Sequence, residues 1–279
     1  MANIHKIISS YTDETLTYNH VKFVEPLVNY HFPLHTHDVC EMIFLKGGNI
    51  SGIIDATTYK PTKNCLLIFR AGIPHRIQIE DDTEYERYDI LFDEKLLANK
   101  IFYRLPKNIC LINCNGNNYI IDSFKKLDYY YEHFTGKDLE ILITKLIEEI
   151  LFNISLLPAN DFNNNLIITH PVINRAVDYI NSHYTENIKI DDISKHLCVA
   201  KSHLHYLFME NLQISPKKFI NIKRLAKAQR LIRMGESPTN IYLACGFSEY
   251  TTFFRSYVSY FGHSPSEENK LPVEREFKS

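Results

Sequence analysis

The spacing of hydrophobic residues changes near residue 118 of this 279-residue chain. Before that point, short apolar runs such as MIFLKGGNISGIID and CLLIFRAGIPHRIQI are broken by glycine and proline, which is typical of strands joined by tight turns. After it, apolar residues recur every three or four positions, as on one face of a helix. The pattern predicts an α+β chain with an N-terminal β-sandwich or β-barrel over residues 1–117 and helices after it.

The segment 118–158 contains two helical stretches, and the second has an amphipathic face. Its apolar residues follow steps of three and four positions from Leu139 to Leu157. Such a face can pair with a second copy of the chain, or it can pack on the chain's own β-domain. We expect a helical dimerisation segment, and therefore a homodimer. The polar, turn-rich residues 159–169 are expected to form a linker.

Composition narrows the class of protein. The chain is 45% hydrophobic and 23% charged, as in ordinary soluble globular proteins. Its apolar runs are shorter than the roughly 18–20 residues that a membrane span needs, and MANIHKIISS contains no apolar signal core. The six cysteines are scattered, which fits free thiols in a reducing compartment. We expect a cytoplasmic protein that does not contact a membrane.

The net charge of −2 is distributed unevenly. From Leu166 onward there are 15 Lys and Arg against 11 Asp and Glu, so this part carries +4 and the preceding part −6. Such asymmetry indicates that the C-terminal part faces an anion, although many solvated surfaces carry as much charge.

The C-terminal third has the pattern of a helix-turn-helix motif. Ile193 and Leu197 supply the inner face of one short helix, Leu204 and Phe208 supply that of the next, and a break is expected near Cys198. A second unit follows about 48 residues later, in NIYLACGFSEYTTFFRSYVSYFGHSP. The two units end in the similar tags QISP and GHSP, and a long helix is expected between them.

The region 172–266 resembles the DNA-binding domain of the AraC/XylS family of transcription regulators. The resemblance implies a double helix-turn-helix domain at 170–268, promoter DNA as partner, and RNA polymerase as a further partner if the protein is an activator, the commoner role in the family. The chain departs from the family pattern at Gln213, at Tyr257-Val258 and at Glu268-Asn269. The matching residues are Ala176, Tyr179, Ile180, Ser202, Leu204, Phe208, Ser215, Pro216, Arg224, Leu225, Ala228, Leu231, Ile241, Ala244, Gly246, Phe247, Phe253, Arg255, Phe261, Gly262, Ser264 and Pro265.

The second helix of each unit is expected to enter a major groove of DNA, where base edges can be distinguished. Arg255 is the best candidate for a guanine contact, worth roughly 1–3 kcal/mol if bidentate; the alternative for it is a surface salt bridge. Arg224 is a candidate phosphate contact or a solvated cation. The expected DNA-facing residues are Lys201, Ser202, His205 and Tyr206 in the first unit and Tyr250, Thr251, Phe254 and Arg255 in the second.

The stretch HTHDVCE places His35, His37 and Glu41 at odd-numbered positions, which share one face in an extended chain. Together with Gly48 and the later RAGIPH, which ends at His75, it resembles the two motifs of cupin domains. Arg70 stands where the second motif has proline. In metal-dependent cupins these two histidines, the glutamate and the later histidine bind the metal.

Three interpretations of these four residues remain open. They can line a pocket for a small-molecule effector, such as a sugar or a small acid, with no cofactor. They can bind a divalent metal for sensing, or they can form a structural hydrogen-bond network. A cupin enzyme fused to a DNA-binding domain is a further alternative, but the C-terminal third favours a regulator that is not an enzyme.

Overall fold

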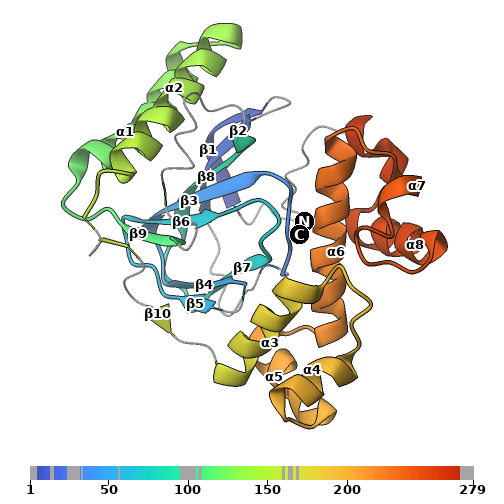
Figure 1. Ribbon diagram of the computed structural model, residues 1–279. Helices are drawn as coiled ribbons and strands as arrows, with labels where there is room; N and C mark the ends of the chain where they lie inside the picture. The colour runs from blue at the N-terminus through green and yellow to red at the C-terminus, as the bar shows by residue number, and fades with distance from the viewer. Residues whose placement is uncertain are drawn as a thin grey trace.

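The computed structural model describes residues 5–12, 16–23, 32, 34–55, 57–94, 105, 109–158, 161–162, 166–167 and 170–270. Strands fill the N-terminal part and helices the C-terminal part, which confirms the α+β class (Figure 1). Most of the expected linker 159–169 lies outside the described residues. No described helix is long and apolar enough to cross a membrane.

The strands form two antiparallel sheets. The larger has the order β1-β2-β8-β3-β6-β9 and the smaller the order β10-β5-β4-β7. The strands are β1 (His5–Thr12), β2 (Leu16–Phe23), β3 (Cys40–Gly47), β4 (Ile50–Ile54), β5 (Thr57–Tyr59), β6 (Cys65–Phe69), β7 (His75–Ile79), β8 (Glu86–Phe92), β9 (Leu111–Asn113) and β10 (Leu166–Ile167).

The two sheets enclose an apolar layer, because successive side chains of a strand point to opposite faces. Ile43, Leu67 and Phe69 of the larger sheet meet Ile54 and Ile77 of the smaller one there. In the described residues, no strand pairing joins one sheet to the other. Of the two expected architectures, the described residues thus form a sandwich of two sheets packed through their side chains, and the cupin-like barrel is not closed.

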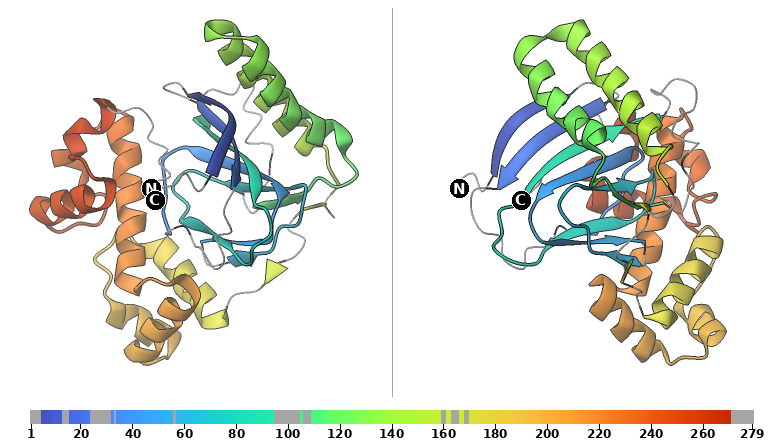
Figure 2. Two further views of the ribbon diagram at one scale, coloured as in Figure 1. Left: turned by 180° about the vertical axis from the view of Figure 1, so that it is seen from behind. Right: turned by 90° about the vertical axis from the view of Figure 1, so that its left-hand side faces the viewer.

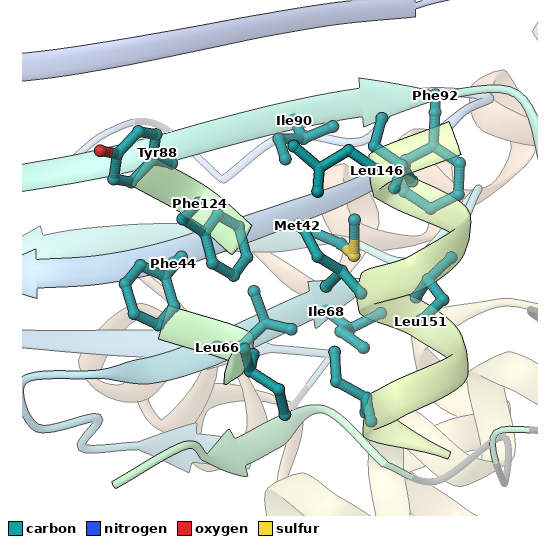
Figure 3. Packing of buried hydrophobic residues seen from close by; sticks show 14 of the residues in the cluster. Met42, Phe44, Leu66, Ile68, Tyr88, Ile90, Phe92, Phe124, Leu146 and Leu151 are labelled. Atoms are coloured by element: carbon teal, nitrogen blue, oxygen red, sulfur yellow. The ribbon is translucent and has the colours of Figure 1, made fainter. Parts of the chain in front are cut away.

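Helices α1 (Asn118–His133) and α2 (Gly136–Ile154) cover the outer face of the larger sheet. Figure 3 shows Phe124, Leu146 and Leu151 of these helices packed on strand residues such as Phe44 and Met42. The Phe44 and Phe124 rings are stacked with centroids 4.2 Å apart. The apolar stripe of α2 thus packs on the chain's own sheet, so a dimer contact through these helices would have to use their other faces.

The C-terminal part contains two helix-turn-helix units joined by the long helix α6 (Figure 1). One core holds the first unit together and another holds the second unit against α6. Ser215 caps α6 by accepting a hydrogen bond from the Lys218 amide, and Pro216 begins it, which explains the first SP tag. The elements are α3 (Pro171–His183), α4 (Ile190–Leu197), α5 (Lys201–Leu212), α6 (Pro216–Arg233), α7 (Pro238–Ile241), α8 (Tyr250–Phe261) and the 3-10 helix η4 (Pro265–Lys270).

Candidate nucleic-acid interface and ligand site

The first recognition helix is α5, and it follows a tight turn. Cys198 takes a left-handed conformation with φ 56°, which turns the chain from α4 into α5. Leu204, Leu207 and Phe208 are buried, so the opposite face of α5 points to solvent. The four predicted DNA-facing residues all lie exposed there: Lys201, Ser202, His205 and Tyr206.

Two of these side chains already have partners in the protein. The Lys201 ammonium lies 2.6 Å from Asp191, and the Tyr206 hydroxyl donates to Glu210 at 3.0 Å. Both contacts lie on the surface, where an ion pair is worth little, so either side chain can exchange its partner for DNA at small cost.

The second recognition helix, α8, presents a comparable face. Thr251 and Arg255 are exposed, the Phe254 ring is 37% exposed, and Tyr250 is half-buried. The Arg255 Nε lies 3.4 Å from the Thr251 carbonyl oxygen of the same helix. In the described part of the chain no carboxylate forms an ion pair with Arg255, so its guanidinium retains donors for a base or a phosphate.

Arg224, a predicted phosphate contact, also has partners within the domain. Its guanidinium donates to the carbonyl oxygens of Tyr184 at 2.6 Å and Glu186 at 2.7 Å, at the end of α3. Its charge also lies over the Phe247 ring at 5.9 Å. These contacts tie α6 to both units, so Arg224 helps to hold the domain together.

The departure Glu268-Asn269 also has a structural explanation. The Glu268 carboxylate is fully buried and accepts hydrogen bonds from Arg233 at 2.7 Å, from Gln229 at 3.0 Å and from the Tyr257 hydroxyl. The Asn269 amide donates to the Ile232 carbonyl at 2.9 Å. These contacts fasten η4 to α6. The only signal in the sequence was the departure itself.

In the N-terminal part, the four residues of the HTHDVCE and RAGIPH motifs come together. Ligand atoms of His35, His37, Glu41 and His75 all lie within 4.8 Å of one another. Glu41 is 6% exposed and His75 is 1% exposed, whereas His35 is the least buried of the four. We call these four residues the His–Glu cluster. The four residues that the two sequence motifs contain are therefore neighbours in the fold.

The imidazoles of His37 and His75 are oriented by backbone carbonyls. Nδ1 of His37 lies 2.8 Å from the Val39 oxygen, and Nδ1 of His75 lies 2.8 Å from the Ile73 oxygen. A carbonyl oxygen only accepts, so each Nδ1 carries the hydrogen. Each Nε2 then faces the same Glu41 oxygen, at 3.0 and 2.9 Å. A hydrogen between each nitrogen and the carboxylate oxygen, or a cation among them, makes these contacts favourable.

The pKa shifts reflect the same arrangement. Burial raises the pKa of the Glu41 carboxyl, but hydrogen bonds from His37 and His75 outweigh it and hold that pKa well below its usual range. Burial likewise opposes the charged form of His37, yet the hydrogen bond and the charge of Glu41 raise its pKa. The cluster thus strongly favours an ionised carboxylate with positive charge around it.

Charged residues that the sequence analysis did not single out extend the cluster into the interior. Asp89 and Arg87 are both 3% exposed and form an ion pair at 3.0 Å, and Arg87 also donates to the Tyr85 hydroxyl at 2.9 Å. Burial and the nearby charge of Glu41 raise the pKa of Asp89 to about 8, against the opposing effect of Arg87. Their place on the inward face of β8 becomes apparent only from its register with β3, which pairs Asp89 with Ile43.

Comparison with known proteins adds to this picture. Residues 193–270 match the family described as "Helix-turn-helix domain". The chain is 29% identical over 149 residues to the lactose operon transcription activator of Staphylococcus xylosus, an alignment that spans 53% of each chain. It is 24% identical over 261 residues to the transcriptional activator RhaS of Escherichia fergusonii, covering 85% of this chain and 87% of that one. A crystal structure of apo ToxT from Vibrio cholerae has a TM-score of 0.42 at 15% identity, covering 94% of this chain and 99% of the other.

Two helix-turn-helix units with exposed recognition helices and relatives that are transcription regulators define the class: this chain is a DNA-binding transcription regulator. The match over residues 193–270 and the relatives named as activators agree with the sequence resemblance to the AraC/XylS family.

Proposed function

We propose that the chain binds promoter DNA through α5 and α8 and activates transcription in response to a small-molecule effector held by the N-terminal sheets. The observation that carries the proposal is the pair of solvent-facing recognition surfaces on α5 and α8, led by Arg255. Both relatives described above are named activators, which supports activation and, with it, contact with RNA polymerase.

The effector is proposed to contact the His–Glu cluster and the charged residues beside it. Imidazoles and carboxylates are suited to the hydroxyl groups of a sugar or to a small acid, because each offers a hydrogen-bond donor or acceptor. One relative is named for the lactose operon, which supports a sugar.

A divalent metal is the second candidate for the cluster, and one observation favours it. Two Nε2 atoms converge on a single ionised carboxylate oxygen, an arrangement that a cation would satisfy without added protons. Three imidazoles and a carboxylate are a suitable ligand set for a divalent transition metal. The carbonyls that fix Nδ1 of His37 and His75 would serve as the outer partners that orient metal ligands.

The remaining features of the proposal concern organisation. We propose a cytoplasmic homodimer that binds two half-sites, with a sensing domain at 1–117, a dimerisation segment at 118–158, a linker at 159–169 and the DNA-binding domain at 170–268. Exposed apolar side chains on and after α2, namely Ile141, Phe152 and Leu156, support a contact through this segment.

The DNA-binding part is tested with DNA that the full chain selects from a random double-stranded pool. We expect Arg255→Ala to abolish binding at concentrations where the wild type saturates, because a bidentate guanine contact is worth roughly 1–3 kcal/mol. Lys137→Ala removes the same charge from α2, far from both recognition helices, and is the control. Normal binding by the Arg255 variant would show that the second recognition surface is misplaced.

The two candidates for the cluster are separated by elemental analysis of full-length protein purified without chelator. If a metal is the ligand, we expect about one divalent ion per wild-type chain, because the four residues form a single site. We expect none in a His35→Ala/His75→Ala variant, because two of the four ligands are lost. Absence of metal from both proteins would leave the organic effector, and a thermal-shift screen of sugars and small acids would follow.

A further inference from the structure

The smaller sheet is a layer whose two faces have different partners. On β4 and β7, Ile54 and His75 point into the space between the sheets, as does Ile77. The alternate residues Ile53 and Arg76 point the other way, and Ile53 belongs to the core of the first helix-turn-helix unit. One layer of backbone therefore separates the His–Glu cluster from the DNA-binding domain.

The segment 34–38 continues this alternation. Its backbone pairs with the start of β7, because the His35 amide donates to the His75 carbonyl at 3.0 Å and the His75 amide returns the bond at 2.9 Å. Farther along, the Gly72 amide donates to the His37 carbonyl at 2.8 Å. The odd-numbered residues His35 and His37 belong to the cluster, so the even-numbered ones are directed to the opposite face.

All three even-numbered residues of the segment contact the DNA-binding domain. Leu34 packs in the core of the first unit. The Thr36 amide donates to the Tyr260 hydroxyl at 3.1 Å, and an Asp38 oxygen lies 3.1 Å from Arg233 Nε. Tyr260 lies in the last turn of the second recognition helix, and Arg233 ends α6. The segment that carries two cluster histidines therefore also touches both DNA-binding units.

Neighbouring contacts strengthen this attachment. Arg76 of β7 donates to Gln213, the residue that ends α5, at 2.7 Å. Asp55, after β4, accepts from Asn181 of α3 at 2.6 Å. Figures 1 and 2 show the helical domain lying along the smaller sheet. The outer faces of α5 and α8 remain exposed. The contacts with the sheet therefore position both helix-turn-helix units without covering the residues expected to contact DNA.

We propose that residues 34–38 are the link through which the state of the His–Glu cluster sets the position of the DNA-binding domain. Adjacent residues in an extended segment share peptide planes, so a displacement of His35 or His37 by a bound sugar, acid or cation also moves Thr36 and Asp38. The inference rests on the proposed function, since it deepens the regulation of the same site. Such a link is allosteric, because it would couple the free energy of binding at the cluster to that of DNA binding.

A double-mutant cycle on the full-length chain tests the link, with DNA selected by the wild type as the probe. His35→Ala perturbs the cluster at its least buried residue. The double substitution Asp38→Ala/Tyr260→Phe removes the two polar contacts of the link and leaves the ion pair between Arg233 and Glu268 in place. We expect His35→Ala to change the Kd for this DNA by about 5- to 100-fold in the wild-type background. In the link-broken background we expect a change of no more than about twofold, because the coupling has been removed.

Hydrogen–deuterium exchange gives a second readout that needs no DNA. His35→Ala should raise amide exchange at residues 257–261 of α8, whereas His133→Ala, the loss of an exposed histidine from α1, should not. His35→Gln replaces His35→Ala if the alanine variant lowers the thermal unfolding temperature.

The possible outcomes distinguish the link from the proposed function. An equal effect of His35→Ala in both backgrounds, or no effect in the wild type, would overturn the link and leave DNA binding intact. If the wild type selected no DNA, the proposed function would fail, and the exchange experiment alone would decide whether the cluster and α8 are coupled. Unchanged exchange at 257–261 would then reject the coupling.

Discussion

Gly246 lies where the second helix-turn-helix unit meets the residues after α3 and the Arg224 side chain of α6. Its φ is +89°, and a Cβ there would lie 2.7 Å from the Tyr184 carbonyl oxygen and 2.8 Å from Arg224 Nε. Those are the two groups that tie α3 to α6. The glycine is therefore required twice, for its backbone conformation and for the space that its missing side chain leaves.

This requirement predicts the effect of a single methyl group. Gly246→Ala should lower the free energy of unfolding by more than about 1–3 kcal/mol, the usual cost of a strained φ alone, because a steric clash is added to it. Gly235→Ala is the matched control, since Gly235 has φ +93° and no atom within 4 Å of its would-be Cβ. Urea denaturation of both variants measures the difference; equal losses would mean that the close approach is unimportant.

At the scale of elements, α1 is fastened to the larger sheet by Asp128 as well as by its apolar face. The carboxylate accepts from Ser9 at 2.5 Å and from Tyr88 at 2.7 Å, and it lies 2.9 Å from His20 Nδ1. Burial alone would raise the pKa of Asp128, but the hydrogen bonds from His20, Ser9 and Tyr88 outweigh it and lower that pKa.

A lowered folded-state pKa fixes the sign of the pH dependence. The stabilisation by Asp128 is complete above the unfolded-state pKa of about 3.9 and is lost as the pH falls through the lower folded-state value. Asp128→Asn should therefore be less stable than the wild type at pH 7, with a difference that shrinks on acidification below about pH 4. Thermal unfolding across this range measures it. Asp122→Asn, in the same helix with its side chain 58% exposed, should have little effect.

The elements also show which parts of the molecule could be predicted from the sequence. Helical periodicity and the positions of Gly246 and Ser215 predicted both helix-turn-helix units, because those signals are local. The same holds for the cluster, where His35, His37 and Glu41 share one short stretch. Local signals do not reveal the partners of Asp38 and Arg224. Asp38 pairs with Arg233, about two hundred residues away, and Arg224 contacts the carbonyl of Tyr184 after α3. Such contacts depend on how the helices and strands pack in the folded chain.

At the scale of the whole molecule, the helices α1 and α2 lie on a different side of the sheets from the DNA-binding domain (Figure 2). Their inner faces are occupied by the larger sheet, so a second copy can reach only the outer residues. Ile141 is 48% exposed and Phe152 is 41% exposed, on either side of the ion pair between Lys145 and Glu148 on α2. An apolar surface of this kind, bordered by charged residues, is typical of a protein–protein contact.

If α2 forms the dimer contact, Ile141→Asp/Phe152→Asp should convert a dimer into a monomer, because two buried carboxylates would face their copies across the symmetry axis. Light scattering at micromolar protein gives the mass. The monomer should still bind a single half-site but lose the added affinity of two linked half-sites, which an anisotropy titration with one- and two-site DNA would show. Ile7→Asp is the control on β1, which forms an edge of the larger sheet and exposes 53% of Ile7. Loss of the dimer in that variant alone would place the interface on the sheet edge instead, because an open edge strand also offers unpaired backbone groups to a second chain.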